Sequence, residues 1–475
     1  MFSKIRACAA AFAVAALLTA CKSLSPDGGM GMVALVAGQS LNKDVVRVSS
    51  SADAQHAQAK VSRLLQAPLT ADAAVQIALL NNPGLQAAYN RLGVAEAITV
   101  QMSRPPLPAF SFEYVSDSVE LDIERKIIGS ILALAVWPSR SKIAGVRFEQ
   151  AQLQAAEETL RLAAETRRAY TRAVAARQIL VTLTATKANA DASAELAGQL
   201  KETGALNRLD QARHQVFATE MAAQLTAAHQ NATATQERLT RLMGLWGTDL
   251  GRLLPSSLPP LPRQSRNLAS VEQEAMDRRV ELAIAKLEVE ALARSYGLTR
   301  HTRFINVLDA GGISKTQKDK GERRANGGGF DIVFEVPLYD FGRARVREAE
   351  QRYFEALNML AEKAVNARSE AREAYGAYSA ARAIVAKYES EVLPLRETIS
   401  AETELQYNAM QVDAFTLLET TRATAAAKVA SIEARRNFWL AYTDLSAVVL
   451  GGGSLNNELS TMLAADIGGG TIRSH

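Results

Sequence analysis

The chain has 475 residues, and its 54 Lys and Arg nearly balance its 50 Asp and Glu, which leaves a formal net charge of +4. This balance excludes the strongly basic surface on which nucleic-acid-binding proteins depend. The length would allow about three domains, but the dominance of Ala, Glu, Gln, Arg and Leu indicates long helices instead. Beyond the first 20 residues, no apolar run is long enough for a membrane-spanning helix.

The N-terminus has the pattern of a secretory signal peptide. A basic start precedes an apolar run over residues 7–20, which is too short for a permanent membrane helix. The run ends in Leu-Thr-Ala-Cys and resembles a bacterial lipobox, in which Cys21 would be acylated after residues 1–20 are removed. The alternative is an ordinary cleavage site with an incidental cysteine. Because Cys8 would leave with the signal peptide and Cys21 would be capped, the mature chain would hold no disulfide. Lys22, where an inner-membrane retention signal would have Asp, leaves sorting to the outer membrane open.

The first half of the mature chain is predicted to be helical with short strands. Residues 21–68 are rich in Ser, Ala and Gln and have weak periodicity, which predicts a tether between the lipid and the body. The first repeat, residues 69–250, begins with a helix that Thr70 can cap. The elements expected in it are a helix over 71–100 that pauses at 81–84, a strand over 110–114, a loop over 116–126, a strand over 127–136, and helices over 143–201 and 210–243.

The second half repeats this order after a Pro-rich linker, residues 251–267. The second repeat covers residues 268–453. The elements expected in it are a helix over 268–296, a strand over 304–314, a loop over 315–329, a strand over 330–336, and helices over 343–407 and 414–449. Pro394 must kink or interrupt the first of these long helices. The Gly-rich tail, residues 454–475, is expected to be loose.

The joint between the last strand and its helix reads FDIVFEVPLYDFGRARVR, residues 330–347. Apolar residues alternate with mostly polar ones, which predicts a strand with one apolar face. Those apolar positions are Phe330, Ile332, Phe334 and Val336. Pro337 and Gly342 then interrupt the run, and helix-favouring residues follow. The sequence therefore predicts a mainly α fold with a small β part, in which two long antiparallel helical hairpins form a two-fold internal repeat.

The order of elements, the doubled hairpin and the Pro-Leu-Tyr-Asp-Phe-Gly-Arg joint resemble the TolC and OprM family of outer-membrane efflux ducts. The resemblance covers residues 69–453. It implies a homotrimer, in which each chain gives four strands to a twelve-stranded transmembrane β-barrel and its helices continue the tube as an α-barrel through the periplasm. It also implies a periplasmic adaptor protein and an inner-membrane transporter as partners, with no catalytic site and no cofactor.

Four strands cannot close a barrel, but strands pooled from several chains can. In such a barrel, alternate side chains face the lipid of the outer membrane and the wet lumen. The lipid-facing positions would be Phe110, Phe112, Tyr114, Phe330, Ile332, Phe334 and Val336. The loops over 116–126 and 315–329 would be extracellular.

The resemblance places a periplasmic gate where the hairpins turn. The family's turn has Tyr-x-x-Gly, with Asp six residues after the Gly. Asp210 follows Gly204 at this spacing, whereas Met410 stands where the second turn would have Gly. The resemblance therefore implies an acidic ring of Asp210 and Glu419, with Tyr407 bonded to Asp210. The alternatives are a helix N-cap role for Asp210 and a solvated helix face for Glu419.

The same turns would dock the hairpin of the adaptor protein. The residues implied are Gly204, Leu206, Leu209, Val412 and Phe415. Plain packing of the turns is the alternative. The five histidines are scattered without the spacing of metal ligands, and no catalytic constellation is evident. A periplasmic coiled-coil lipoprotein scaffold without a pore is the rival function, but it leaves the four strands unexplained.

Overall fold

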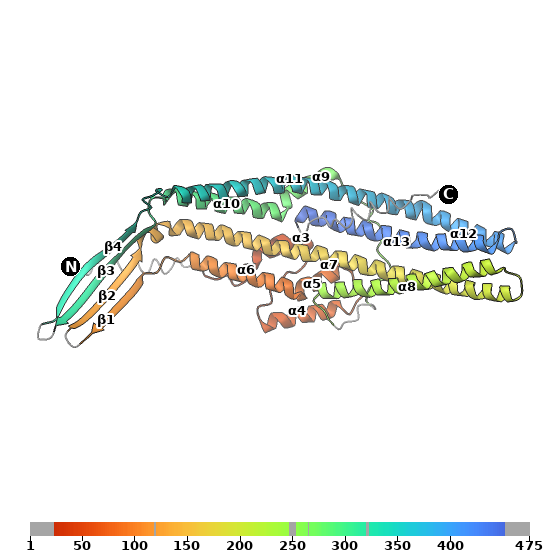
Figure 1. Ribbon diagram of the computed structural model, residues 1–475, viewed down its shortest axis with the longest axis horizontal. Helices are drawn as coiled ribbons and strands as arrows, with labels where there is room; N and C mark the ends of the chain where they lie inside the picture. The colour runs from red at the N-terminus through yellow and green to blue at the C-terminus, as the bar shows by residue number, and fades with distance from the viewer. Residues whose placement is uncertain (1–22, 118–119, 247–252, 265, 320–322, 452–475) are drawn as a thin grey trace. The chain divides into compact units, whose positions relative to one another are not determined.

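The structure is a computed structural model, and it describes residues 23–117, 120–246, 253–264, 266–319 and 323–451. The chain is mainly helical, with one four-stranded sheet (Figure 1). The described residues fall into two compact units: those within 23–33, 89–155 and 281–364 form the first, and those within 34–88, 156–280 and 365–451 form the second. Among the described residues, no helix is both long and apolar enough to span a membrane. Cys21, the signal peptide and the tail over 454–475 lie outside the described residues.

The sheet belongs to the first unit and is antiparallel throughout, in the order β1-β2-β3-β4 (Figure 1). The strands are β1 (Ala109–Ser116), β2 (Glu120–Ser130), β3 (Val307–Asp319) and β4 (Ala325–Glu335). Phe110 lies opposite Ile127, Ile127 opposite Gly312, and Gly312 opposite Phe330. Residues opposite one another share a face of the sheet, so the aromatic rows of β1 and β4 lie on the same face.

That face is open and mostly apolar, although Arg125 lies on it opposite Phe112, whereas the other face carries most of the charged residues. Phe110 is 75% exposed and Phe330 is 83% exposed. The remaining large apolar side chains of these rows are also exposed: Phe112, Tyr114, Ile332 and Phe334. On the opposite face, Lys315 pairs with Asp122 at 2.7 Å, and Lys126 pairs with Asp331. The predicted amphipathic alternation is therefore confirmed for both edge strands.

The predicted loops between the strands are wrong. β2 begins at Glu120 and β3 continues to Asp319, so most of 116–126 and part of 315–329 belong to strands. Their acidic and basic residues looked like loop residues, but they alternate and pair across the sheet. The strand expected over 127–136 ends at Ser130, where helix begins. Val336 falls one residue beyond β4.

Polar contacts fix the helices of the first unit. The elements with residues there are α2 (Met30–Val33), α6 (Pro83–Met102), α7 (Ile131–Glu202), α10 (Val280–His301) and α11 (Arg343–Lys387). The Trp137 indole N–H donates to the carbonyl of Ser103 at 2.9 Å. Arg147 forms an ion pair with Glu288. Pro138 lies inside α7, so that helix starts earlier than the sequence predicted.

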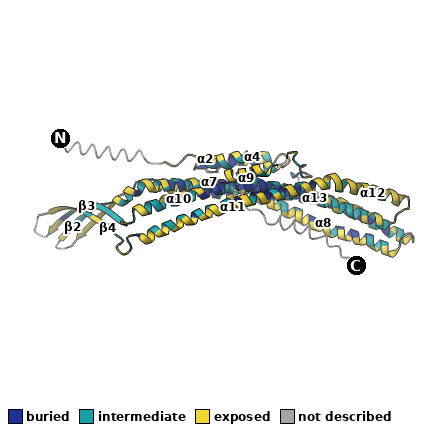
Figure 2. Ribbon diagram, turned by 90° about the horizontal axis from the view of Figure 1, so that it is seen from above, coloured by how far each residue is buried: buried dark blue, intermediate teal, exposed yellow. Residues whose placement is uncertain are grey.

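The core of the second unit lies around α5 (Ala71–Asn81), α9 (Leu268–Arg278) and the end of α13 (Ala414–Leu450). Figure 2 shows buried residues gathered in this helical region, while the strands are mostly exposed or half-buried. Tyr378 and Phe438 are almost fully buried, with ring centres 5.6 Å apart. Thr70 caps α5, as predicted, because its side chain accepts from the Ala73 N–H at 3.1 Å.

Two segments that the sequence presented as tether and linker pack against this core. Residues 34–68 contain a π-helical turn (Ala34–Gly38), α3 (Gln39–Leu41) and α4 (Ser51–Leu64). The Asp44 N–H donates to the side-chain oxygen of Gln76 at 3.0 Å. Within the linker, Leu254 and Leu258 are buried. Weak periodicity arises because these segments are short and bury only occasional side chains, so it does not indicate an extended tether.

The breaks near Pro83 and Pro394 fall where the sequence marks them, but the break at Arg279 was not predicted and divides the single helix expected over 268–296. The chain leaves helical geometry at Asn82 (φ −73°, ψ 116°) and, in the second half, at Arg279 (φ −67°, ψ 116°). α8 (Arg208–Leu242) follows α7. A π-helical turn (Tyr388–Val392) separates α11 from α12 (Leu393–Asn408), so Pro394 falls in the first turn of a new helix. Gly451, in the left-handed conformation, ends α13.

Candidate functional site

The candidate site lies where α7 turns into α8 and where α12 turns into α13, all within the second unit. Gly204 has φ +77° and Met410 has φ +60°. The residue after each donates its N–H to the carbonyl five residues earlier, at 2.8 Å in both turns. Both turns therefore close their helix by the same left-handed C-terminal motif, although only one has glycine there.

Each turn leads into a helix through a side-chain cap. Asn207 caps α8 by accepting from the Asp210 N–H at 2.9 Å. Asp413 caps α13 by accepting from the Thr416 N–H at 2.9 Å. The hydrogen bonds from Thr416 hold the pKa of the Asp413 carboxyl below its usual value, and the charge of Arg213 contributes. The alternative role of Asp210 as an N-cap is wrong, since Asp210 is the third residue of its helix.

Arg213 connects the two turns. Its Nη1 donates to Asp210 at 3.0 Å, and its guanidinium carbon lies 4.1 Å from the centre of the Phe415 ring. The Asp210 carboxylate also accepts from the Asn207 side chain at 2.6 Å. A hydrogen bond from Tyr407 to Asp210 stays a prediction, since the hydrogen bonds found at the Asp210 carboxylate come from Asn207 and Arg213.

Arg422 makes the reciprocal connection from α13 back to α8. It donates to Glu419 at 3.1 Å and forms an ion pair with Glu220. Its guanidinium carbon lies 5.4 Å from the centre of the Phe217 ring. Each hairpin thus places an arginine over a phenylalanine of the other, an attraction between a cation and an aromatic face. Glu419 lies on an exposed helix face, but its charge is paired.

A cavity of about 390 Å³ lies between the two hairpins beside these contacts. The polar side chains that line it are Asn189, Ser193, His214, Ser400, Glu404, Tyr407, Asn408 and Thr421. His214 is buried, and its Nδ1 lies 2.8 Å from the Ser193 hydroxyl. Burial lowers the pKa of His214, although the carboxylate of Asp210 opposes the shift.

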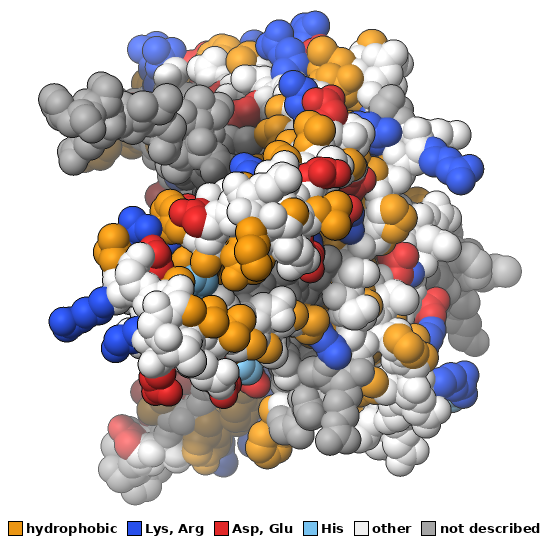
Figure 3. Space-filling model, turned by 90° about the vertical axis from the view of Figure 1, so that its right-hand side faces the viewer, with side chains coloured by type: hydrophobic (Ala, Val, Ile, Leu, Met, Phe, Trp, Pro, Cys, Tyr) orange, Lys and Arg blue, Asp and Glu red, His pale blue; other side chains and the backbone are white. Residues whose placement is uncertain are grey.

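The predicted docking residues surround the turns with different exposure. Leu209 is 61% exposed and Gly204 is exposed, whereas Leu206, Val412 and Phe415 are half-buried. Figure 3, a view of the end that carries the turns, shows hydrophobic side chains exposed among charged ones. Arg213, Arg422 and His214 are not among the site residues predicted from the sequence. A signal was available for both arginines, because each stands three residues after a predicted acidic position and can reach it on a helix.

The residues that the structure describes contain no group of three His, Cys, Asp or Glu side chains able to hold a metal ion. No protein-family model and no curated protein matches the chain. Solved structures do match. The Campylobacter jejuni CmeC outer membrane channel is similar with a TM-score of 0.69 and 15% identity, over 86% of this chain and 89% of that one.

Two further solved structures resemble the chain. The outer-membrane channel OprN has a TM-score of 0.68 and 18% identity, over 88% of this chain and 95% of that one. The outer membrane protein VceC from Vibrio cholerae has a TM-score of 0.64 and 16% identity, over 85% and 99%. The chain therefore has the fold of these outer-membrane proteins, and the predicted mainly helical fold with a small β part is confirmed.

Proposed function

We propose that the chain is the outer-membrane duct of a tripartite efflux or secretion system, which passively conducts substrates delivered by a transporter and an adaptor protein. One observation carries this proposal: a four-stranded sheet has one open, mostly apolar face, one face with most of the charged residues, and two edge strands. In water, such an apolar face would be a liability. In a bilayer, it is the surface that a membrane-spanning strand needs.

The edges of the sheet call for other copies of the chain. β1 and β4 each have one neighbour in the sheet, and unpaired backbone groups cannot face lipid. Three copies, with β4 of each paired to β1 of the next, would close a twelve-stranded barrel whose charged faces line a wet lumen. Cys21, if acylated, would add a lipid anchor in the outer membrane, and the helices would extend into the periplasm.

The hairpin turns are the proposed periplasmic gate. Asp210 and Glu419 would ring the aperture with carboxylates, and such a ring favours cations over anions. The contacts of Arg213 and Arg422 support the closed arrangement, since they tie each hairpin to the other. Tyr407 would add a bond to Asp210 in the assembled gate. No catalytic chemistry and no cofactor are needed for passive conduction.

The exposed turns are the proposed docking surface for the adaptor protein. Leu209 and Gly204 offer an exposed apolar edge. Leu206, Val412 and Phe415 would become accessible as the turns part. Two of the solved structures with this fold, CmeC and OprN, are outer-membrane channels by name, which supports the duct but identifies no partner of this chain.

Reconstitution into liposomes separates the duct from a pore-free scaffold lipoprotein. A duct makes the vesicles permeable to small sugars in proportion to the protein added, whereas a scaffold leaves them sealed. Sealed vesicles that contain correctly folded, inserted protein would remove the proposal.

Single-channel recording tests the gate. The double variant Asp210→Ala/Glu419→Ala should conduct more than the wild type and be blocked less by multivalent cations, since the carboxylates are gone. The matched control is Glu237→Ala, an exposed carboxylate further along α8. Unchanged conductance and block in the double variant would refute the gate assignment without affecting the duct.

A further inference from the structure

The segment between β4 and α11, residues 336–342, is called the joint from here on. It exposes apolar side chains to solvent, and hydrogen bonds fix its backbone. Tyr339 is fully exposed, Leu338 is 71% exposed, and Phe341 is 50% exposed. Phe341 has φ +50°, a conformation that costs free energy for a residue with a large side chain. Clustered apolar exposure of this kind marks an interaction surface.

Hydrogen bonds hold this joint in one conformation. The Asp340 carboxylate accepts from the Gly342 N–H at 2.9 Å and from the Ala344 N–H at 3.0 Å. These bonds keep the pKa of Asp340 below its usual value. A side chain at Gly342 would place its Cβ 2.3 Å from the carbonyl of Arg303, so the backbone approaches closely there. The joint is preorganised, which lowers the entropic cost of binding.

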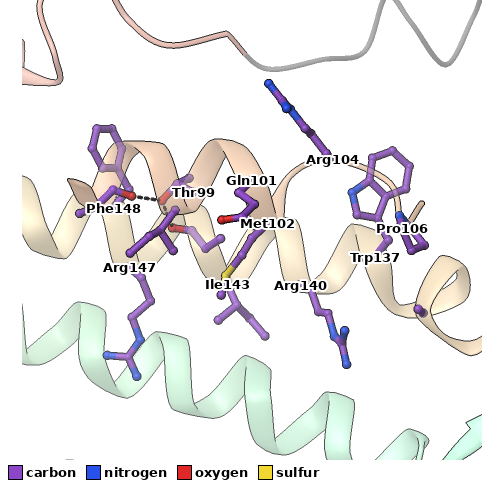
Figure 4. A pocket seen from close by; sticks show the side chains of 14 residues that line it. Thr99, Gln101, Met102, Arg104, Pro106, Trp137, Arg140, Ile143, Arg147 and Phe148 are labelled. Atoms are coloured by element: carbon purple, nitrogen blue, oxygen red, sulfur yellow. Dashed lines mark hydrogen bonds between the residues drawn. The ribbon is translucent and has the colours of Figure 1, made fainter. Parts of the chain in front are cut away.

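An apolar groove of about 700 Å³ lies in the same unit, between α6 and the start of α7. Met102 and Ile143 point into it, Trp137 lies beside Pro106 at one end, and Arg104 and Arg140 extend on opposite sides (Figure 4). Met102 is 56% exposed.

The sheet places the joint and the groove at the same end but on opposite edges. β1 begins at Ala109, directly after the groove residues, and β4 ends at Glu335, directly before the joint. In an antiparallel ring, β4 of one copy runs beside β1 of the next. The end of β4 then meets the start of the neighbouring β1, and the joint meets the neighbouring groove.

We infer that the joint of each copy, through Leu338 and Tyr339, inserts into the groove between α6 and α7 of a second copy and so fixes the register of the assembled ring. The inference rests on the proposed duct, since ring closure brings the two surfaces together. The surfaces are complementary: the groove is apolar, and the guanidinium groups at its sides favour an aromatic face such as that of Tyr339. The contact is head-to-tail, so it repeats until the ring closes.

Disulfide trapping tests the contact. Mature chains offer no free thiol if Cys21 is acylated, because Cys8 leaves with the signal peptide. The variant Met102→Cys/Tyr339→Cys, oxidised in the membrane, should yield covalent dimers and trimers. Val115→Cys/Tyr339→Cys is the matched control, because Val115 is exposed but lies at the far end of β1. This control should stay monomeric under denaturing conditions.

The results that would overturn this contact differ from those that would overturn the proposed duct. If the Met102/Tyr339 pair forms no covalent oligomer while the reduced protein is trimeric and conducts, the joint does not occupy the groove and the duct stands. Labelling of Tyr339→Cys by a lipid-soluble reagent in that same trimer would likewise exclude the contact and leave the duct intact. If the protein is monomeric and non-conducting, both ideas are overturned.

Substitution at Tyr339 gives a second measurement. Tyr339→Asp should raise the concentration at which half of the oligomer dissociates by roughly tenfold or more, since a charge would enter an apolar groove. Tyr339→Phe should leave it unchanged. Because the side chain is fully exposed in the single chain, neither substitution disturbs folding. Equal dissociation of Tyr339→Asp and the wild type would overturn the inference.

Discussion

The turn at Gly204 and the turn at Met410 follow the same backbone path with different side chains. Both are left-handed, and in both the residue that follows donates its N–H to the carbonyl five residues earlier at 2.8 Å. The first turn has the residue that suits this conformation, an uncharged cap in Asn207, and a buried histidine nearby. The second has a strained Met410 and a charged cap in Asp413. The two turns share one backbone geometry, but we expect their stabilities to respond differently to substitution and to pH.

The largest expected difference between the two hairpins is the free energy of local opening that is lost when the phenylalanine beneath each arginine is removed. Phe217 is 2% exposed and packs in a tip cluster with Met221 and Leu418. Phe217→Ala should lower the free energy of local opening by about 3 kcal/mol, because it leaves a cavity in that cluster. Phe415→Ala should cost about 1 kcal/mol, chiefly the lost attraction to Arg213.

Native-state hydrogen exchange of amides at the ends of α8 and α13 measures both effects. Ser295→Ala, in the half-buried part of a helix of the first unit, serves as the control that should leave the turns unchanged. Equal losses from the two phenylalanine variants would contradict the comparison, since they would mean that the hairpins share one packing centre.

Exchanging the left-handed residues should change stability in opposite directions. Met410→Gly should stabilise its turn by about 1 kcal/mol, because glycine removes the strain of positive φ. Gly204→Ala should destabilise the first turn by about 1 kcal/mol. The cost at Gly204 comes from the backbone alone, since no atom lies within 4 Å of the added Cβ. Exchange rates at residues 203–207 and 409–413 report each effect, and a loss of stability in Met410→Gly would rule out the strain.

The two hairpins should respond to pH in different ranges. The pKa of buried His214 is lowered from 6.5, so an opened tip binds protons more readily than the closed one. Its stabilising packing is complete above 6.5 and is lost as pH falls below that value. The pKa of Asp413 is lowered from 3.8, so the stability from its cap is lost only as pH falls further, through 3.8 and below.

Hydrogen exchange at about pH 7.5 and about pH 5.5, corrected for intrinsic rates, isolates the histidine. The wild-type tip should open more at the lower pH, and His214→Gln should lose this dependence. The Glu404 carboxylate lines the same cavity and can also titrate. Glu404→Gln is therefore the control, and it should keep the pH dependence of the wild type. A wild-type tip with equal protection at both pH values would exclude His214 as a pH-sensitive element.

Local chemistry made part of this structure predictable. The cap at Thr70, the break near Pro394 and the alternation in β4 are each set by a few neighbouring residues. The β2 and β3 ends were not predictable this way, because Lys315 and Asp122 become strand residues only when they pair across the sheet. The packing of residues 34–68 depends on distant partners such as Gln76.

In the candidate site too, features set by neighbouring residues were predictable and features set by distant packing were not. The turn at Gly204 and its counterpart at Met410 follow from spacing in the sequence. The roles of Arg213 and Arg422 depend on which helix of the other hairpin lies opposite. His214 gave no signal, because its burial and its contact with Ser193 arise only when α7 and α8 pack together.

The central claim is that one face of the sheet meets lipid and the other meets water. Single cysteines along β1, at positions 110–114, test it in reconstituted membranes with a water-soluble thiol reagent. The account predicts labelling at Ser111→Cys and Glu113→Cys, and protection at Phe110→Cys, Phe112→Cys and Tyr114→Cys. Equal labelling at all five positions would contradict it.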